Sequence, residues 1–365
     1  MSKKKIILVA GARPNFMKIA PLMREFRKFP KEFAPVLVHT GQHYDTAMSD
    51  VFFKDLNIPE PDINLNVGSA SHTVQTARIM TKFERVLKEE RPQLVIVVGD
   101  VNSTLACSLV ASKMGVRVAH VEAGLRSFDR DMPEETNRVL TDRLSDYLFV
   151  TEPSGLVNLR KEGVSDDKVF YVGNVMIDTL LAHLPQIQKG PVPKRGQPPK
   201  RYAVLTLHRP GNVDSTFTLT GIYEILEFVT REIPVIYPIH PRARKMIRRH
   251  NFLKAFNKLD NLEMVEPLGY VDFIRLVSKA RFVLTDSGGI QEEATVLEIP
   301  CLTMRENTER PVTVDQGTNI LVGRNIAKII RSVGAILNGR AGKPTRPKFW
   351  DGKAAGRIVK VLSEQ

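Results

Sequence analysis

Acidic residues follow predicted strands in the first half of the chain. Asp100 ends the apolar run LVIVVGD, Glu122 ends VRVAHVE, and Glu134 and Glu135 follow Pro133 in MPEETNR. Carboxylates gathered at one edge of a sheet could take up and return protons. Asp100 could instead cap the next helix, and the two acids after Pro133 could face the positive end of a helix dipole. Glu122 has no comparable capping role, which favours a function there.

A second pattern with chemical meaning is LTDSGGIQEEA, residues 284–294. It predicts a buried strand that ends at Asp286, a Ser-Gly-Gly turn, and a helix with Glu292 and Glu293 in its first turn. Glycines at a helix start expose backbone N–H groups, and the helix dipole attracts an anion such as phosphate. The same residues would also suit a tight turn without any ligand, so the pattern alone leaves both possibilities open.

Three of the eight histidines follow predicted strands: His43 in TGQHYD, His208 in LTLHRPGN and His240 in YPIHPRAR. A single loop histidine is usually solvated, but three at corresponding strand ends indicate a cleft. Their spacing does not match the H-E-x-x-H zinc pattern, so no metal is expected. The DRD triplet at 129–131 resembles the metal-binding D-x-D pair of one glycosyltransferase class. It does not follow a strand of a nucleotide-binding domain, which favours chance.

Composition limits the class of protein. The 365 residues are 42% hydrophobic and 25% charged, without an apolar run of membrane-spanning length or a signal-peptide cleavage site. We therefore expect a cytoplasmic protein of two domains. Cys107 and Cys301 lie in apolar segments and indicate core thiols. The net charge of +13 favours an anionic partner. Because Lys and Arg are spread along the chain, a phosphorylated small molecule is preferred over nucleic acid or a membrane surface.

The elements that must position these residues alternate between strand and helix. Continuous Val/Ile/Leu runs such as KIILVAG, APVLVHT, YAVLTLH and RFVLTD are separated by amphipathic helices. This predicts an α/β protein with parallel sheets covered on both faces. Residues 184–204, rich in Pro, Lys and Gly, predict a linker or exposed loop, and 349–362 predict a final amphipathic helix. We expect two Rossmann-like doubly wound domains facing each other across a cleft.

Several motifs together resemble one enzyme family. Neither a P-loop nor a G-x-G-x-x-G after the first strand is present, which removes the usual support for ATP hydrolysis and nicotinamide binding. The stretches GARPNFMK, GDVNST, HVEAGLRS, PEETNR, HRPGN and TDSGGIQEEA, with TERPVTVDQGTN, resemble the non-hydrolysing UDP-N-acetylglucosamine 2-epimerases. The resemblance implies a glycosyltransferase-B-like fold and a homodimer. It also implies a first domain at 1–175, a UDP-binding domain at 176–348, and a C-terminal helix, 349–365, packed back on the first domain.

The resemblance implies chemistry that needs no cofactor. UDP would leave C1 of the sugar while the C2 proton is removed, and it would then add back to the resulting glycal. Asp100, Glu122 and Glu134 fill the acid/base positions, and His208 supports the leaving group or the sugar. Substrate-binding positions implied in the same way are Arg13, Lys18 and Arg310 near the diphosphate, Ser287, Gly288 and Gly289 at the helix start, Glu293 on the ribose, Leu268 and Phe273 beside uracil, and His43 and His240.

The chain departs from the family pattern at three places. Many bacterial members have Arg-Pro-Glu where this chain has Arg13-Pro14-Asn15. Tyr44-Asp45 and Thr73-Val74 differ from the stretches that form a second, allosteric UDP-sugar pocket in those members, so activation by the substrate is not expected. The exact acetamido sugar stays open. A glycosyltransferase or a hydrolysing epimerase on the same fold is the alternative enzyme, and a basic nucleic-acid-binding protein is the alternative of another class.

Overall fold

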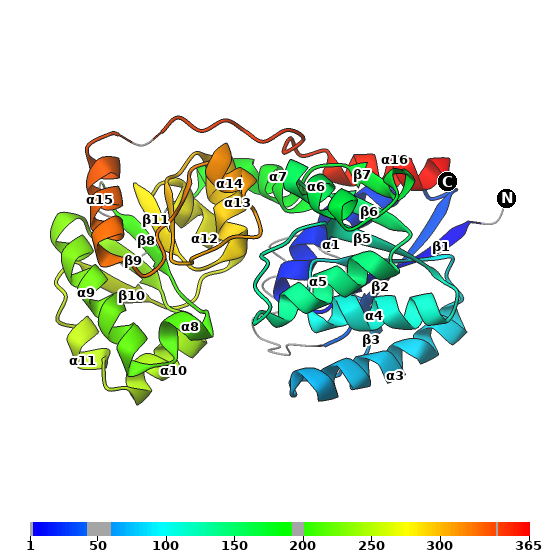
Figure 1. Ribbon diagram of the computed structural model, residues 1–365, viewed down its shortest axis with the longest axis horizontal. Helices are drawn as coiled ribbons and strands as arrows, with labels where there is room; N and C mark the ends of the chain where they lie inside the picture. Colours follow the sequence, from blue (N-terminus) through cyan, green and yellow to red (C-terminus); the bar gives the residue numbers. More distant parts are fainter. Residues whose placement is uncertain (1–2, 42–59, 192–200, 341) are drawn as a thin grey trace. The chain divides into compact units, whose positions relative to one another are not determined.

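The computed structural model describes residues 3–41, 60–191, 201–340 and 342–365. The chain forms two compact units. The N-terminal unit comprises Met1–His183 and Lys348–Gln365, and the C-terminal unit comprises Leu184–Pro347. Each unit contains one parallel β-sheet with helices on its faces (Figure 1).

The N-terminal unit is built on a parallel sheet of order β3-β2-β1-β4-β5-β6-β7. Its strands are β1 (Lys4–Ala10), β2 (Phe33–His39), β3 (Ile63–Asn64), β4 (Leu94–Val98), β5 (Arg117–Ala123), β6 (Tyr147–Val150) and β7 (Val169–Tyr171). The chain begins at the centre with β1, moves outward to β3, and returns on the other side of β1 with β4. The carboxyl ends of β1 and β4 therefore diverge at a switch point, where doubly wound folds bind ligands.

Two layers of helices cover this sheet. They are α1 (Arg13–Phe26), α3 (His72–Glu90), α4 (Asn102–Lys113), α5 (Pro133–Leu144), α6 (Pro153–Lys161), the short 3-10 helix η1 (Asp166–Lys168), α7 (Val175–Lys189) and α16 (Ala354–Glu364). On one face α4 packs against α3 and α5, and on the other α1 packs against α16 (Figure 1). The sheet is thus buried between them.

The C-terminal unit repeats this plan with a sheet of order β10-β9-β8-β11-β12-β13. Its strands are β8 (Ala203–Thr206), β9 (Val235–Pro238), β10 (Leu262–Val265), β11 (Phe282–Thr285), β12 (Cys301–Thr303) and β13 (Asn319–Leu321). Its helices are α8 (Pro210–Val213), α9 (Thr216–Glu232), α10 (Pro241–Arg249), α11 (Leu253–Phe256), α12 (Tyr270–Ser278), α13 (Gly288–Leu297), α14 (Val312–Asp315) and α15 (Ile326–Leu337). The switch point lies between β8 and β11. The predicted α/β class with two Rossmann-like doubly wound sheets is confirmed.

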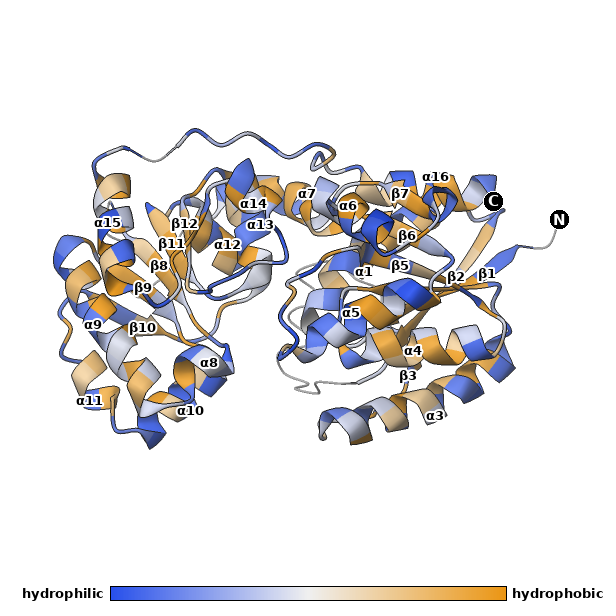
Figure 2. Cartoon of the chain, in the orientation of Figure 1, coloured by the Kyte–Doolittle hydropathy of each residue, from blue (hydrophilic) through white to orange (hydrophobic). Residues whose placement is uncertain are grey.

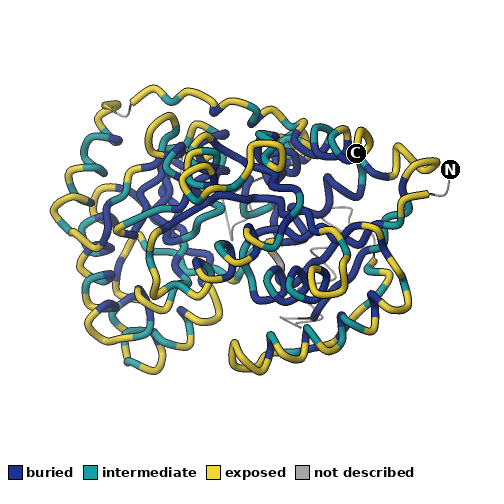
Figure 3. Tube along the Cα trace, turned by 45° about the vertical axis from the view of Figure 1, so that its right-hand side comes forward, coloured by how far each residue is buried: buried dark blue, intermediate teal, exposed yellow. Residues whose placement is uncertain are grey.

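Burial of the sheets explains the sequence pattern. Every residue of β4, LVIVV, is buried, as is every residue of β11, FVLT. In Figure 2 the strands are mainly hydrophobic, whereas most helices carry one hydrophobic and one hydrophilic side. Figure 3 shows the buried segments inside each unit and the exposed ones on the outer helices and loops. Strands buried on both faces need continuous apolar runs, which is why the strands could be read from the sequence.

The C-terminal segment joins the N-terminal unit through specific contacts. Trp350 is fully buried, and its indole N–H donates to the Thr151 carbonyl at 3.0 Å. Asp178 of α7 accepts hydrogen bonds from the first backbone N–H groups of α16, at 3.1 and 2.7 Å. Gly173 has φ +88°, and a Cβ there would lie 2.1 Å from the Phe349 carbonyl oxygen. The closeness of that carbonyl requires glycine.

The predicted linker at 184–204 is wrong in its first part. α7 continues to Lys189 and includes Pro185. The last residues of α7, from Leu184 on, belong to the C-terminal unit. There the guanidinium of Arg275, on α12, donates to the carbonyls of Ile187 and Gln186 at 3.0 Å each, so the end of this helix is satisfied by a neighbouring helix. Residues 192–200 lie outside the described part. Across the described ranges, the structure contains no helix whose length and apolar character would let it cross a membrane.

Candidate active site

Asp100 and Glu122 lie at the same edge of the N-terminal sheet, because Asp100 follows β4 and Glu122 lies at the carboxyl end of its parallel neighbour β5. Gly99, between β4 and Asp100, has φ +67°. A Cβ at Gly99 would lie 2.9 Å from Lys18 Nζ and 3.3 Å from Glu122 Oε2. The glycine therefore leaves room for these two side chains beside the end of β4. The structure thus brings together three of the predicted residues.

Glu122 has an unusual backbone. Its φ is +80°, in the left-handed region that residues other than glycine rarely adopt. The pairing of β5 with β6 shifts register at this position. The side chain forms an ion pair with Lys18, and both side chains are almost fully buried. Because a buried charge requires a partner, Lys18 favours the carboxylate form of Glu122. A strained backbone that aims a paired acid is typical of functional sites.

Asp100 is more accessible than Glu122, with a side chain that is 28% exposed. Its carboxylate pairs with Arg138 of α5. Its backbone carbonyl accepts a hydrogen bond from Asn137 at 2.9 Å. The N-cap residue of α4 is Val101. The capping explanation for Asp100 is therefore wrong, and the residue presents a partly exposed acid at the strand end.

The neighbouring acids of α5 differ in their surroundings. Glu135 is buried and accepts hydrogen bonds from the backbone and hydroxyl of Ser127, at 2.9 and 2.8 Å, and from the Phe128 N–H at 2.9 Å. It also pairs with Arg138. Glu134 is half-buried, and its side chain makes no hydrogen bond or ion pair with another residue in the described ranges. Glu135 therefore fastens the loop before α5, while the Glu134 carboxylate stays available.

The turn after β1 is tied to β4 by Asn15, the residue at which this chain departs from the Arg-Pro-Glu pattern. The Asn15 side-chain oxygen accepts from the N–H groups of Gly11 and Ala12 at 3.0 and 2.8 Å, and its amide donates to the Val98 carbonyl at 3.0 Å. This places Lys18, one turn later, beside Glu122. The side chain of Arg13, and His43 as a whole, lie outside what the structure describes.

In the C-terminal unit His208 contacts a buried aspartate, Asp286. The His208 ring nitrogen Nδ1 lies 2.8 Å from Asp286 Oδ1. Asp286 also accepts hydrogen bonds from the backbone N–H of Arg209 at 2.9 Å and from the Asn212 amide at 3.0 Å. Burial opposes ionisation of Asp286, but the hydrogen bonds from His208, Asn212 and Arg209 outweigh it and hold the pKa of its carboxyl below the usual value. Asp286 therefore orients the His208 ring.

The helix α13 starts where the glycine motif was expected. Ser287 is its N-cap residue, and Gly288 and Gly289 form its first positions. The Arg310 guanidinium lies against this turn, since a Cβ on Gly288 would be 2.8 Å from Arg310 Nη1. Arg310 is buried and pairs with Glu292 and with Glu309. The arginine thus sits beside the predicted anion site, but two carboxylates already offset its charge.

Glu293, the predicted ribose ligand, is buried. Desolvation raises the pKa of its carboxyl to about 8, and the nearby charge of Glu292 adds to the rise, while a hydrogen bond with Tyr270 opposes it. Leu268 and Phe273, predicted beside uracil, pack against a cluster of buried residues that includes Ile290 of α13. These side chains therefore lie near the start of α13, in the same unit.

His240 is close to His208, with ring centroids 5.7 Å apart. It is exposed, and its Nδ1 accepts a hydrogen bond from the Arg242 backbone N–H at 3.2 Å, which caps α10. His208 and His240 thus lie together after the neighbouring strands β8 and β9. The cleft inferred from the three histidines stays a prediction.

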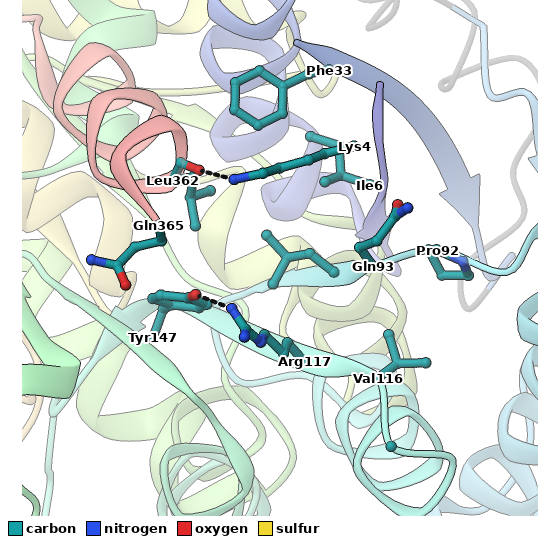
Figure 4. A pocket seen from close by; sticks show the side chains of 12 residues that line it. Lys4, Ile6, Phe33, Pro92, Gln93, Val116, Arg117, Tyr147, Leu362 and Gln365 are labelled. Atoms are coloured by element: carbon teal, nitrogen blue, oxygen red, sulfur yellow. Dashed lines mark hydrogen bonds between the residues drawn. The ribbon is translucent and has the colours of Figure 1, made fainter. Parts of the chain in front are cut away.

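The cavity drawn in Figure 4 lies at the opposite edge of the N-terminal sheet. It has a volume of about 380 Å³ and is lined by the first residues of β1, β4, β5 and β6 and by the end of α16. Lys4 donates to the Leu362 carbonyl at 3.2 Å, and Arg117 donates to the Tyr147 hydroxyl at 2.9 Å (Figure 4). Since the predicted residues follow the carboxyl ends of strands, this cavity is not part of the candidate active site.

Comparisons with known proteins decide the family. The sequence model of the UDP-N-acetylglucosamine 2-epimerase family matches residues 25–363. The chain belongs to this family. It is 42% identical to the UDP-N-acetylglucosamine 2-epimerase of Methanocaldococcus jannaschii, across 98% of this chain and 99% of that protein. It is 39% identical to a UDP-2,3-diacetamido-2,3-dideoxy-D-glucuronate 2-epimerase of Pseudomonas aeruginosa, across 99% of each protein.

A solved structure agrees with this assignment. The crystal structure of the M. jannaschii UDP-GlcNAc 2-epimerase in complex with UDP-GlcNAc and UDP matches with a TM-score of 0.90 and 42% identity, over 99% of this chain and 100% of that chain. The resemblance read from the motifs is therefore confirmed, and so is the glycosyltransferase-B-like fold. Among the described residues, no group of three or more His, Cys, Asp or Glu side chains could hold a metal ion. Cys107 and Cys301 are free and buried.

Residues that support the epimerase motifs were missed in the sequence. Asp286 was recognised only as a strand end and not as the partner of His208. His120, Asp142 and Arg138 were not singled out, although all three are buried and ion-paired or hydrogen-bonded. The one available signal was His120 itself, a polar residue inside the apolar run VRVAHVE. A buried polar side chain needs a partner, but the sequence does not say which residue supplies it.

Proposed function

We propose that this protein interconverts UDP-N-acetylglucosamine and UDP-N-acetylmannosamine without an added cofactor. The C2 proton passes to a base on the protein while the C1–O bond breaks with its electrons going to UDP, which leaves 2-acetamidoglucal. UDP then adds back to C1, and a proton is delivered to the opposite face of C2. Atoms and charges balance without an oxidant or reductant.

The observation that carries this proposal is the pair of acids at the ends of β4 and β5. The route needs acid/base groups that reach the two faces of C2. Glu122 is held by its strained backbone and by Lys18, while Asp100 is partly exposed and is held by Arg138. Two acids from adjacent strands with different partners can take different roles. Glu134 is a third acid, and its carboxylate is available.

The C-terminal unit supplies the binding part of the proposal. The start of α13 offers backbone donors at the positive end of the helix for the diphosphate, and Arg310 lies against that turn. Glu293 accepts hydrogen bonds from the ribose hydroxyls, and the backbone near Leu268 and Phe273 holds uracil. His208, oriented by Asp286, stabilises the departing UDP. The family resemblance also implies substrate-binding roles for Arg13, Lys18 and His43 in the first half of the sequence and for His240 in the C-terminal unit.

A second substrate is supported by the relative from P. aeruginosa, whose name specifies a UDP-2,3-diacetamido-2,3-dideoxy-D-glucuronate. Its identity of 39% is close to the 42% of the M. jannaschii protein. The same elimination at C1 and C2 would serve this sugar, since its differences lie at C3 and C6. The ratio of kcat/KM for the two sugars separates the candidates.

The test is product analysis with purified protein, UDP-N-acetylglucosamine and no added cofactor. The proposal predicts UDP-N-acetylmannosamine at equilibrium with the substrate, detected by proton NMR. Release of free N-acetylmannosamine would show a hydrolysing enzyme, and sugar transfer to an added acceptor would show a glycosyltransferase. If no UDP-sugar reacts and DNA binds tightly with steep salt dependence, the protein is a nucleic-acid binder instead.

We also propose that the protein acts as a cytoplasmic homodimer, in keeping with the family resemblance. Analytical ultracentrifugation at micromolar concentration measures the oligomeric state directly. A monomer at all concentrations would contradict the dimer, and secretion of the full chain by its native host would contradict the location.

A further inference from the structure

A buried charged network lies behind the candidate base Glu122. It contains His120 on β5, Asp142 on α5, Arg126 in the loop after β5, and Glu162 after α6. The side chains of His120 and Asp142 are fully buried, that of Arg126 is 1% exposed, and that of Glu162 is 28% exposed. Charges in such a place are stable only when they are paired and hydrogen-bonded.

Both ring nitrogens of His120 face acceptors. Nδ1 lies 2.6 Å from Asp142 Oδ1, and Nε2 lies 2.8 Å from the carbonyl oxygen of Gly99. A backbone carbonyl has no proton to give, so Nε2 must carry one. The contact with Asp142 requires a second proton, either on Nδ1 or on the carboxyl group. The pair therefore holds one proton more than a neutral histidine beside a carboxylate.

The surroundings of Asp142 place that proton on the histidine. Asp142 Oδ2 accepts hydrogen bonds from the Gly124 N–H at 3.0 Å and pairs with Arg126 at 2.7 Å. Although burial opposes ionisation, His120 and Arg126 hold the pKa of the Asp142 carboxyl below its usual value. With His120 as an imidazolium, two positive and two negative charges balance in the network. With a neutral His120 and an ionised Asp142, one negative charge would remain without compensation.

The same atoms fix the two turns that carry the candidate acids. The Gly99 carbonyl is held by His120, and the Gly99 N–H donates to the Val121 carbonyl at 3.0 Å. Gly124, with φ +80°, is held through its N–H by Asp142. Asp100 follows the first turn directly. Glu122 lies between His120 and Gly124, at the residue with the left-handed backbone.

We propose that His120 is a positioning residue, kept as an imidazolium between Asp142 and the Gly99 carbonyl, which sets the spacing of Asp100 and Glu122. The consequence for catalysis rests on the proposed epimerase function, whereas the protonation of His120 does not. The charged groups around it are Asp142 and Arg126, with Glu162 behind Arg126, and Lys18 and Glu122 on the other side of Gly99.

The protonation is tested on the unmodified protein labelled with ¹⁵N-histidine. We expect both nitrogens of His120 to carry protons at pH 7.5, with both N–H signals protected from exchange. The signal is assigned by its loss in His120→Gln. If that variant does not fold, the assignment uses the proximity of the ring Nδ1 proton to the Gly124 N–H proton, because both donate to Asp142. A single protonated nitrogen at pH 7.5 would overturn the proposal.

The positioning role is tested by kinetics of His120→Gln, Asp142→Asn and the double variant. We expect kcat to fall about 10²-fold, the loss typical of a small misplacement of reacting groups, while the Kd of UDP stays within about twofold. Because both residues act through the same His120–Asp142 contact, kcat of the double variant should fall about as much as kcat of either single variant. His183→Gln, another buried histidine of the N-terminal unit, is the control and should keep kcat.

Two outcomes would contradict the role. One is a folded His120→Gln or Asp142→Asn protein whose kcat is within about threefold of the parent. The other is an additive loss in the double variant, which would show that the two residues act separately. If the parent protein has no epimerase activity, the proposed function fails, yet the nitrogen spectrum still decides the state of His120.

Discussion

Two buried glutamates, one in each unit, show how the same side chain is fitted to different tasks. Glu122 is buried beside the ammonium group of Lys18, and its backbone is strained. Glu293 is buried beside Glu292 and Tyr270, and its pKa is raised to about 8. Desolvation, with the charge of Glu292 adding to it, therefore favours a neutral acid at Glu293, whereas the ammonium group of Lys18 favours a charged acid at Glu122. Burial favours the neutral form of an acid unless a group of opposite charge lies beside it.

Loss of proton transfer should reduce turnover more than any other change. Glu122→Gln and Asp100→Asn preserve shape and remove an acid, so each should lower turnover by about 10²–10⁴-fold, the usual contribution of a general acid or base. UDP affinity, measured by calorimetry, should remain close to that of the parent. Glu134→Gln belongs to the same test. Near-native turnover in any of the three variants would show that the replaced residue takes no part in proton transfer.

A smaller effect is expected at the start of α13. A Cβ at Gly288 would lie 2.8 Å from Arg310 Nη1 and 3.0 Å from Glu309 Oε1. Gly288→Ala must displace the arginine and also blocks the close approach of a phosphate to the backbone. We expect UDP to bind about 10–100-fold more weakly, in line with the loss of hydrogen bonds to a charged group. Gly221→Ala, where a Cβ meets open space, is the matched control. If calorimetry shows equal UDP affinity in the parent, Gly288→Ala and Gly221→Ala, the turn at the start of α13 is not part of the UDP-binding site.

The state of Glu293 predicts an effect on stability. Its folded pKa of about 8 lies above the ordinary glutamate value of 4.5, so the folded protein binds more protons than the unfolded chain between these values. The contribution of Glu293 to stability is therefore lost as pH rises toward and through 8. Glu293→Gln should remove this loss and become more stable relative to the parent by up to a few kcal/mol at pH 9. Urea unfolding at pH 5 and pH 9 measures it. An equal difference at both pH values would show that Glu293 does not titrate in this range.

No effect at all is expected from a substrate activator. Val74, in the first turn of α3, is 42% exposed and offers no side-chain donor, and Tyr44-Asp45 lies outside the described residues. With UDP-N-acetylmannosamine as the only substrate, turnover should begin without a lag. A lag that a trace of UDP-N-acetylglucosamine abolishes would show that the chain has an activating site after all.

The fold was more predictable than the site. Apolar runs such as LVIVV and FVLT identify strands because both faces of each sheet are buried. The helix through 184–189 was missed because its end is satisfied by Arg275, which is distant in sequence. The motifs identified the acids and the glycine turn, but they did not indicate which side chains pair with these residues. The pairing of Asp286 with His208, of Arg138 with Asp100 and of Asp142 with His120 depends on contacts that only the folded chain creates.

Epimerisation by elimination requires that the C2 proton leaves the sugar during each turnover. The most direct measurement is a proton NMR time course of UDP-N-acetylglucosamine with the protein in heavy water. The elimination route predicts that deuterium enters C2 of the product, and of substrate recovered at equilibrium, without an added cofactor. Formation of UDP-N-acetylmannosamine with its original hydrogen at C2 would contradict it.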